Sequence, residues 1–427
     1  MGHIAHAGSV LVLSKETAMV PRARRAAFAV AIAAVPLLAG ADVVTDWNTT
    51  VTAVTSTGAS PPQVRAYALV HAAMHDAVNA IEHRYQPYAV DLKAPAGANV
   101  DAAAAAAAHG VLTAILPSQK AAADAALAAS LAKIPDGTSK TDGVAAGAQV
   151  AAKFLALRND DGFSAKVDVK PLAAAPGVWQ LTPGWPAPLA TQWGRMKPMV
   201  IAKLSEFDLG GPPPVGSERF ARDYNEIKAV GARSSSVRTA DQTAVAIFWT
   251  SQTLAVWNAV AQAAARAHKL SVPEDARLFA LVNIAAYDST IVYVDQKYRY
   301  NFWRPYTAIR TGAGTALAAD ASWEPLLATP GHPEYPSGHC TNSGAVAEVL
   351  RRFFEDDRVD VSFTYPLQFG VTRTWKSFTE IEAEVLDARV WGGIHYRGTD
   401  EVSTTIGRKI GEHVVAKALL PVKMAER

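Results

Sequence analysis

Apolar residues recur at helical spacing over most of the chain, and alternation of apolar and polar residues at strand spacing is scarce. The segments predicted as helices are 65–84, 101–116, 118–134, 143–158, 239–268, 274–297, 343–354, 377–391 and 402–419. Thr239 is followed three residues later by Gln242, the spacing of a capping box, and Ser118 and Ser377 are suitable N-caps. The pattern predicts an all-α fold.

One long segment breaks this pattern. Residues 171–214 are rich in proline, glycine and tryptophan, which is typical of a packed connection without regular elements. We therefore expect an N-terminal helical half at 42–170, a connection at 171–237, and a C-terminal helical half at 238–427.

The two halves resemble each other. Segment 70–76 (VHAAMHD) matches 282–288 (VNIAAYD), and the G-x3-G-x2-V-x2-K spacing that starts at Gly143 recurs from Gly407. Small residues four apart let two helix backbones approach closely. The order of the matches predicts two four-helix-bundle-like halves related by an internal duplication. The alternative is that alanine-rich helices resemble one another by chance.

The chain starts with features of an export signal. Arginines at 22, 24 and 25 precede an uncharged stretch at 26–38, and Ala39-Gly40-Ala41 then offers a small-residue cleavage site. We expect a signal peptide at 1–41, with Met19 as a second candidate start, and export to the periplasm or beyond. Adjacent arginines also fit twin-arginine export. The alternative is a buried N-terminal helix.

Composition narrows the functions that are possible. Half of the 427 residues are hydrophobic, so a disordered chain is excluded. A net charge of +2 gives no broad electrostatic footprint for nucleic acid. The single cysteine, Cys340, excludes an intramolecular disulfide and a cysteine-based zinc cluster. After residue 45, charges and glycines interrupt the apolar runs, so we expect no membrane span, which needs about 20 residues.

Three short segments of the second half carry a dense set of reactive side chains. They read K-x6-R-P from residue 297, P-S-G-H from residue 336, and R-x5-H from residue 389. The residues are Lys297, Arg304, Ser337, Gly338, His339, Arg389 and His395. Cations, a hydroxyl and an approachable backbone N–H are what a tetrahedral oxyanion requires. One imidazole can then attack or ligate the central atom while the other transfers protons.

These three motifs resemble the signature of the vanadium-dependent haloperoxidases and of the type 2 phosphatidic acid phosphatase superfamily that shares their site. The helix start at 238–242 (RTADQ), the segment 65–79 and the Trp/Pro-rich connection resemble the soluble bacterial branch. The resemblance covers roughly residues 43–420 and implies an all-helical pair of four-helix bundles.

The resemblance also implies roles for the residues. His395 would ligate the vanadium of vanadate, or form a phosphohistidine in a phosphatase, and His339 would be the acid-base residue. The remaining residues would hold the equatorial oxygens, and Lys297 would help to activate peroxide: Lys297, Arg304, Ser337, Gly338 and Arg389. Hydrogen peroxide, a halide and a small organic acceptor would be the substrates, without haem or flavin.

Two other functions fit the same residues. A soluble acid phosphatase would use the same pocket, because vanadate and phosphate are nearly isosteric. A non-catalytic phosphate or vanadate binding protein is the third hypothesis, although simple binding needs no proton-transferring imidazole. A homodimer is compatible with the large apolar helical faces.

Two positions depart from the family pattern. The family often has an aspartate four residues after the ligating histidine, where this chain has Thr399, with Asp400 one residue later. On a regular helix, position i+5 points about 140° away from position i, so Asp400 could orient His395 only from an irregular backbone. Ala388 stands where a serine is common.

Three further histidines each have a functional and a purely structural interpretation. His332 lies where bromoperoxidases of the family carry a second histidine, which favours bromide or iodide, but a loop histidine bonded to backbone fits as well. His71 and His75 have the i, i+4 spacing of metal ligands, yet their counterparts Asn283 and Tyr287 indicate packing positions.

Two kinds of side chain lie next to the motifs. Phe302 and Trp303 precede Arg304 and could form a wall of the pocket or pack in the core. Cys340 follows His339 directly, where peroxide could oxidise it if it is not simply buried.

Overall fold

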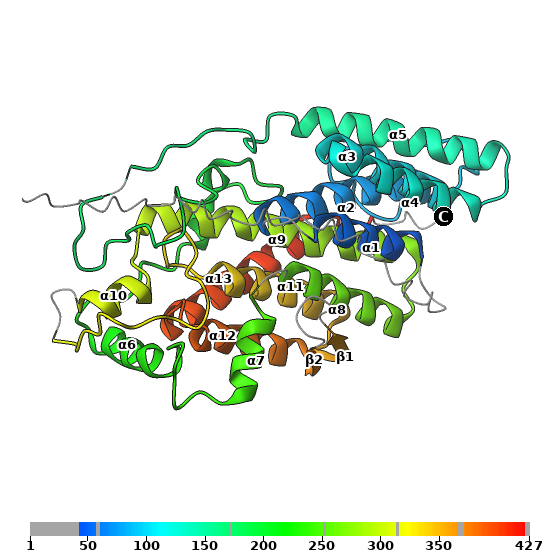
Figure 1. The fold of residues 1–427 in the computed structure, drawn as a ribbon. Coiled ribbons are helices and arrows are strands. Elements are labelled where there is room, and N and C mark those ends of the chain that lie inside the picture. The colour runs from blue at the N-terminus through cyan, green and yellow to red at the C-terminus, as the bar shows by residue number, and fades with distance from the viewer. Residues whose placement is uncertain are drawn as a thin grey trace, which may run out of the picture. The chain divides into compact units, whose positions relative to one another are not determined.

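Helices make up most of the protein (Figure 1). A computed structural model describes residues 42–56, 60–170, 172–250, 253–312, 316–364 and 371–422, so the expected signal peptide at 1–41 lies outside the described residues. The helices are α1 (Val43–Thr55), α2 (Ser60–Glu82), α3 (Val100–Ile115), α4 (Lys120–Ala132), α5 (Thr138–Arg158), α6 (Glu218–Val230), α7 (Ala240–Phe248), α8 (Thr253–His268), α9 (Val272–Tyr300), α10 (Pro305–Thr311), α11 (Gly338–Phe354), α12 (Phe378–Trp391) and α13 (Arg397–Lys417). The short elements are the 3₁₀ helices η1 (Pro117–Gln119), η2 (Trp193–Arg195) and η3 (Leu204–Phe207), and the strands β1 (Arg358–Thr364) and β2 (Thr372–Ser377).

The mostly helical prediction is confirmed, with two corrections. The segment expected as one helix at 239–268 forms two, because α7 ends at Phe248 and α8 begins at Thr253. Strands β1 and β2 form an antiparallel pair that the all-α prediction missed. In the sequence, β1 could have been recognised from a short alternation of apolar and polar residues, which places Val359 and Val361 on the buried face. The capping box of α7 is present, with Gln242 N donating to Thr239 Oγ1 at 3.2 Å.

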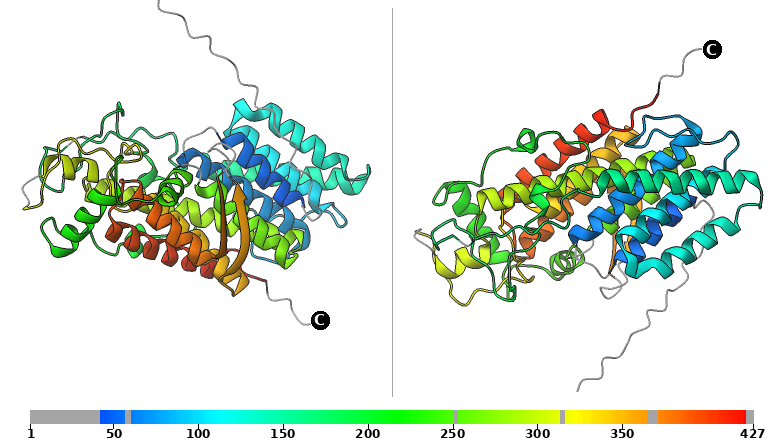
Figure 2. Two further views of the ribbon diagram at one scale, coloured as in Figure 1. Left: turned by 60° about the horizontal axis from the view of Figure 1, so that its bottom comes forward. Right: turned by 90° about the horizontal axis from the view of Figure 1, so that it is seen from above.

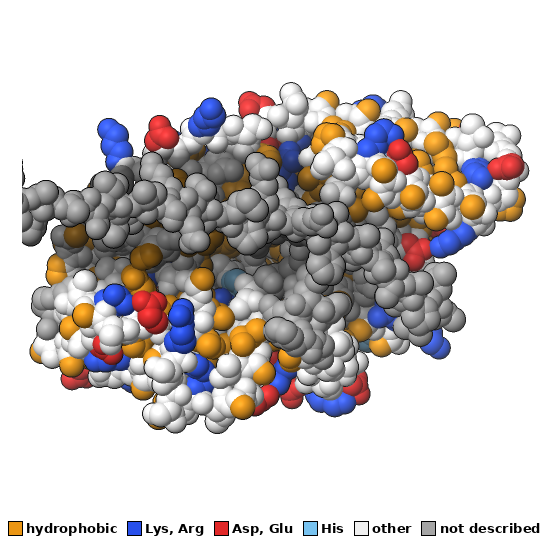
Figure 3. Space-filling model, viewed as in Figure 1, with side chains coloured by type: hydrophobic (Ala, Val, Ile, Leu, Met, Phe, Trp, Pro, Cys, Tyr) orange, Lys and Arg blue, Asp and Glu red, His pale blue; other side chains and the backbone are white. Residues whose placement is uncertain are grey.

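The long helix α9 forms the centre of the fold. It packs against α2, α11 and α13, and most of its side chains are buried (Figures 1 and 2). Among the described helices, α9 has the length and hydropathy of a membrane span, but 94% of that window is buried by other elements, as in a core helix. On the face in Figure 3, basic and acidic side chains are interspersed over the described surface.

Glycines allow two pairs of helices to pack at backbone contact. A Cβ atom at Gly147 of α5 would lie 2.1 Å from the Ala103 carbonyl oxygen of α3. A Cβ atom at Gly407 of α13 would lie 2.1 Å from the Thr341 carbonyl oxygen of α11. Neither position can accept a side chain without moving a helix, so the spacing seen in the sequence has the same steric purpose in both halves.

Two matching aspartates hold the loops beside α2 and α9. Asp76 accepts hydrogen bonds from the backbone N–H groups of residues 88–90, and Asp288 accepts them from residues 199–201. Both carboxylates are buried, and burial raises the pKa of each to about 6. Each aspartate thus satisfies three backbone N–H groups of its loop.

His71 and His75 are packing residues rather than metal ligands. His71 Nε2 lies 2.9 Å from Asn48 Nδ2, which in turn donates to Asn258 Oδ1 at 2.6 Å. His75 Nε2 lies 3.2 Å from the Gln86 carbonyl oxygen. Burial lowers the pKa of His71 to about 3, so the ring is neutral. Within the described residues, no three His, Cys, Asp or Glu side chains are grouped as a metal site.

The Pro/Trp-rich connection folds back over the second half. Trp179 N donates to the Asn301 carbonyl at 2.8 Å, and Leu189 N donates to the Gly331 carbonyl at 2.9 Å. These backbone bonds fix the connection beside the end of α9 and the loop that leads into α11. Side chains of residues 185–193 therefore cover the region where the reactive motifs meet.

The α11–α13 contact gives the first testable prediction. Gly407→Ala should lower the free energy of unfolding by about 3 kcal/mol, the upper end of the cost of overpacking, because the new methyl group meets the Thr341 carbonyl. Chemical denaturation measures this value. Lys409→Ala, at an exposed position of the same helix, is the control and should stay within about 0.5 kcal/mol of the wild type. Equal effects of the two changes would contradict the close-packing argument.

Candidate active site

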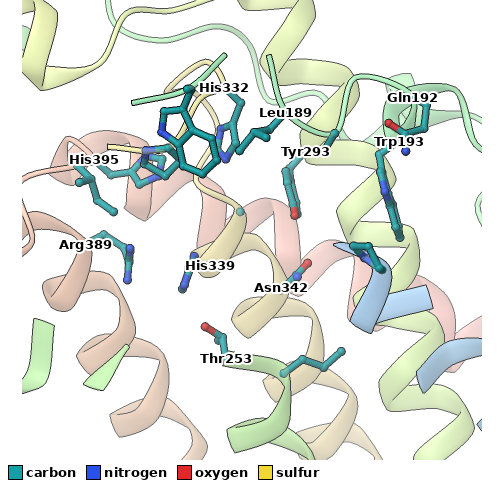
Figure 4. A pocket seen from close by; sticks show the side chains of 17 residues that line it. Leu189, Gln192, Trp193, Thr253, Tyr293, His332, His339, Asn342, Arg389 and His395 are labelled. Carbon is teal, nitrogen blue, oxygen red and sulfur yellow. The ribbon is translucent and has the colours of Figure 1, made fainter. Parts of the chain in front are cut away.

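The second and third sequence motifs meet at one cavity of about 440 Å³, and Arg304 of the first motif lies behind its lining, in contact with His395. The loop before α11, the first turn of α11, the end of α12 and the α12–α13 connection form one side, and the Pro/Trp-rich connection forms another. His332, His339, Arg389 and His395 all reach this cavity (Figure 4). The structure therefore brings together residues that lie up to a hundred positions apart in the sequence.

A buried carboxylate orients His395. Nδ1 of His395 lies 2.9 Å from Glu334 Oε1, and Nε2 lies 3.1 Å from Arg304 Nη1. A guanidinium can only donate, so Nε2 is the acceptor and Nδ1 carries the proton that is donated to Glu334. Nε2 of His395 is thus held unprotonated, which is the form needed to ligate a metal or to attack a central atom.

Glu334 is itself fixed by the residues that follow His395. Thr399 Oγ1 donates to Glu334 Oε2 at 2.9 Å, and the backbone N–H of Tyr396 donates to Glu334 Oε1 at 3.1 Å. Glu334 lies outside the three sequence motifs and was not predicted. From the sequence it was open whether Thr399 or Asp400 orients the ring of His395. Neither does so directly, because Thr399 acts through Glu334.

Asp400 points away from His395, as expected for position i+5. It lies in the first turn of α13, and its Oδ1 accepts from Cys340 Sγ at 3.2 Å. Burial raises the pKa of the Cys340 thiol well above its usual value, and the Asp400 charge adds to this effect. Cys340 is therefore a buried thiol and not a reactive thiolate.

Arg304 connects two imidazoles. Besides His395, its guanidinium donates to the His332 carbonyl at 3.0 Å and to His332 Nδ1 at 2.9 Å. Nδ1 of His332 also lies 3.1 Å from the Pro333 carbonyl oxygen, so this nitrogen faces both a donor and an acceptor. Burial, with the charges of Lys297 and Arg304, lowers the pKa of His332 well below its usual value. His332 is thus a neutral ring that lines the cavity beside His395.

Among the motif residues at or next to the cavity, three buried polar atoms have no hydrogen-bond partner within the described part of the chain. They are Ser337 Oγ, His339 Nε2 and Arg389 Nε. Ser337 is the N-cap of α11, so the first N–H groups and the positive end of the helix dipole lie beside these atoms. Buried polar groups are rarely left unpaired, so this arrangement fits an anion with several acceptor oxygens.

Gly338 lets the chain pass close to an aromatic ring. A Cβ atom here would lie 2.9 Å from Tyr293 Cζ, so any other residue would displace the ring or the helix start. Arg389 is fixed from the other side, where its Nη1 donates to the Trp249 carbonyl. Burial lowers the pKa of Arg389 to about 10, and the group stays cationic at neutral pH.

Lys297 holds the loop that carries Glu334. Its Nζ donates to the backbone carbonyls of Pro333 at 3.0 Å, Glu334 at 2.9 Å and Pro336. Three acceptors use all three protons of an ammonium group. Burial, with the charge of Arg304, lowers the pKa of Lys297, while Glu334 and Asp400 oppose this shift. Lys297 therefore positions the loop, and its predicted contact with an oxyanion requires one of these bonds to be exchanged.

The aromatic residues before Arg304 do not line the cavity. Phe302 and Trp303 pack against Phe220, with ring centroids 6.2 and 6.1 Å away, in a second apolar cluster that includes Tyr396. Of the two readings of these residues, core packing is the one that the structure supports. The cluster adjoins Glu334, because the Glu334 N–H donates to the Phe302 carbonyl at 2.9 Å and Tyr396 N donates to Glu334 Oε1 at 3.1 Å.

Comparison with known proteins adds an independent observation. Residues 277–423 match the family described as the VCPO second helical-bundle domain. Vanadium chloroperoxidase of Curvularia inaequalis is 38% identical over 89 residues, a match that covers 18% of this chain and only 14% of that protein. The crystal structure of the first bacterial vanadium-dependent iodoperoxidase superposes with a TM-score of 0.78 at 26% identity, covering 89% of this chain and 97% of that one.

The second half of the chain thus resembles the second helical-bundle domain of the vanadium haloperoxidase family. It is a homologue of vanadium-dependent iodo- and chloroperoxidases. The apo-type bacterial vanadium-dependent chloroperoxidase shares the fold, with a TM-score of 0.69 at 20% identity over 84% of this chain and 94% of that chain. The iodoperoxidase likeness extends over both helical halves and the connection, whereas the sequence match to the family covers the half that carries the three motifs.

The contact between Glu334 and His395 gives a testable prediction. Glu334→Gln should weaken vanadate binding about 10- to 100-fold, because an amide oxygen accepts more weakly from Nδ1–H and the amide can turn to face the ring with its NH₂ group. Isothermal titration calorimetry with orthovanadate measures the change. Glu206→Gln, at an exposed site in η3, is the matched control. Unaltered affinity in Glu334→Gln would remove Glu334 from the orientation of His395.

Proposed function

We propose that this protein is a vanadium-dependent haloperoxidase, which oxidises halide with hydrogen peroxide at a vanadate held by His395. The observation that carries the proposal is the unprotonated Nε2 of His395 at a cavity whose lining residues His339 and Arg389 have buried polar atoms without partners in the described chain. When bound, vanadate supplies an electrophilic vanadium(V) centre that activates hydrogen peroxide toward attack by halide.

The residues of this chain would share the work as follows. His395 would ligate the metal through Nε2, with Glu334 holding the proton on Nδ1. The Ser337 hydroxyl and the Arg389 guanidinium would donate to the oxygens, and Arg304 would add a second fixed positive charge beside His395. The N–H of Gly338, at the start of α11, would donate from the helix terminus.

His339 is proposed as the acid-base residue. Burial lowers its pKa well below the usual value, and the charges of Arg389 and Lys297 add to the effect. The ring is therefore neutral at neutral pH, and its Nε2 is free to exchange a proton with a bound oxygen. Its position in the first turn of α11 places it next to Ser337 and Gly338.

The second candidate is an acid phosphatase with a phosphohistidine intermediate at His395. The same Nε2 could attack phosphorus, because nothing in the set of donors distinguishes phosphate from vanadate. Homology to vanadium-dependent iodo- and chloroperoxidases favours the first candidate.

We also infer that the two halves arose by duplication. Asp76 and Asp288 bind loop N–H groups in the same way, and the glycine contacts of α5 on α3 and of α13 on α11 have the same geometry. Only the second copy has the reactive motifs, so the first copy supplies packing surface.

His395→Ala provides the test of the proposed function. In protein incubated with orthovanadate, bromination of a phenol-type dye with bromide and peroxide should fall to background, since no other imidazole is oriented by Glu334. The same protein without vanadate should be assayed for hydrolysis of a phosphomonoester. If only the vanadate-free wild type is active, on the phosphoester, and vanadate inhibits it, the phosphatase is the correct function. Halide oxidation by His395→Ala would remove this residue from the mechanism.

His339→Ala separates turnover from binding. Removal of a positioned acid-base group should lower kcat about 10²- to 10⁴-fold, while the affinity for vanadate should change only a few-fold. Steady-state kinetics and calorimetry measure the two quantities. His268→Ala, an exposed histidine of α8, is the control. Unchanged kcat in His339→Ala would contradict the assigned role.

A further inference from the structure

The cavity is larger than the proposed inorganic reaction requires. Its volume of about 440 Å³ falls within the range of roughly 300–1,000 Å³ found for pockets that bind drug-sized molecules. An oxyanion, a peroxide and a halide together have only a handful of atoms. Figure 4 shows His332, His395 and Arg389 on one side of the cavity, with Trp193 and Gln192 well separated on the other. A second part of the cavity therefore lies beyond the oxyanion donors.

The aromatic walls of the cavity are rigid. Trp185 closes the end next to His332, because its Nε1 donates to the Thr329 carbonyl at 2.8 Å and its ring lies against Gly331, where a Cβ atom would be 2.7 Å from Trp185 Cγ. Trp193 is 1% exposed and packs on Tyr287 at a centroid distance of 5.6 Å. Walls that are already ordered lose little conformational entropy when a ligand binds.

Two polar groups face this part of the cavity. Asn342 is 8% exposed, and its Oδ1 accepts from Ser289 Oγ at 2.6 Å and lies 3.3 Å from Thr290 Oγ1. With Oδ1 engaged, the Nδ2 amide is the donor that Asn342 offers, and no acceptor is bonded to it in the described chain. Thr253 Oγ1, on the wall formed by α8, likewise has no partner among the described residues. These groups suit a ligand with an acceptor oxygen.

The charge of the lining favours a neutral ligand. Among the described residues that line the cavity, Arg389 has a permanent charge, and it lies with His395 at the oxyanion end (Figure 4). Near Asn342 and Trp193, the described lining has an amide and an indole ring but no cation that would bind a carboxylate.

We propose that this second part of the cavity binds a neutral aromatic compound with a hydroxyl or carbonyl oxygen, of the phenol class, and that halogenation occurs on this bound molecule. The proposal rests on the proposed halide oxidation. In that reaction the halide gives two electrons to the O–O bond of peroxide, which with one proton yields hypohalous acid and water. The aromatic ring then forms the carbon–halogen bond, and the proton of the broken C–H bond leaves with hydroxide as a second water.

Binding can be tested without turnover, using the full chain and 1-naphthol as the probe. Isothermal titration calorimetry should show saturable binding at one site. Asn342→Leu should weaken naphthol binding roughly tenfold, the value of a lost hydrogen bond, but should leave the binding of naphthalene unchanged. Ser289 and Thr290 retain the Ala286 carbonyl as an acceptor, so this variant should fold.

A second variant and a control complete the binding test. Leu189→Trp should fill the cavity and abolish binding of both probes, whereas Asn225→Leu, at an exposed position of α6, should change neither. Absence of saturable naphthol binding, or binding that both cavity variants leave intact, would overturn the proposal.

Product analysis tests the same idea during catalysis. With vanadate, peroxide and bromide, the ratio of ortho to para bromination of 1-naphthol should differ at least threefold from that given by reagent hypobromous acid. An identical ratio would mean that halogenation occurs in solution and would refute the proposal. If the protein oxidises no halide, the proposed function fails instead, and the calorimetric test still decides whether the cavity binds the phenol.

Discussion

The buried carboxylate of Glu334 is the group on which the electrostatics of the site depend. Lys297, Arg304 and Arg389 place three cations in a region without bulk water, where unpaired charges are costly. Glu334 opposes that charge, and burial still raises its pKa to about 7, chiefly through lost hydration. The same carboxylate accepts the hydrogen bond from His395 Nδ1–H. Glu334 therefore both offsets the positive charge of the cluster and orients the ring of His395.

The fold supports this cluster by fixing backbones rather than side chains alone. Lys297 at the end of α9 binds three carbonyls of the 333–336 loop, and Ser337 N donates to Ser403 Oγ of α13 at 2.8 Å. The α11–α13 contact at Gly407 keeps these two helices at a separation that a methyl group would disturb. Errors in helix position are therefore transmitted directly to the donors of the site.

Much of this arrangement could be predicted from the sequence, and the exceptions have physical causes. Helical periodicity located most long helices. The motifs identified His339, Arg389 and His395, which converge at the cavity, and Arg304, which contacts His395. Glu334 was missed because its role depends on a distant partner, although an acidic residue within a proline-rich turn was a usable signal. The contacts of Lys297 were not predictable, since a motif shows the residue type but not which acceptors are nearby. The connection could not be placed because it has no periodicity.

The interruption between α7 and α8 has a consequence for how this protein tolerates change. Within an uninterrupted helix, the carbonyl of Trp249 would be engaged by an amide one turn further on. Because α7 ends at Phe248, that oxygen is available to the guanidinium of Arg389. Continuation of the helix and the contact of Arg389 thus compete for one oxygen atom. Substitutions that raise helix propensity near Trp249 would stabilise the helix but remove the acceptor of Arg389. Selection for thermal stability alone would therefore act against this contact.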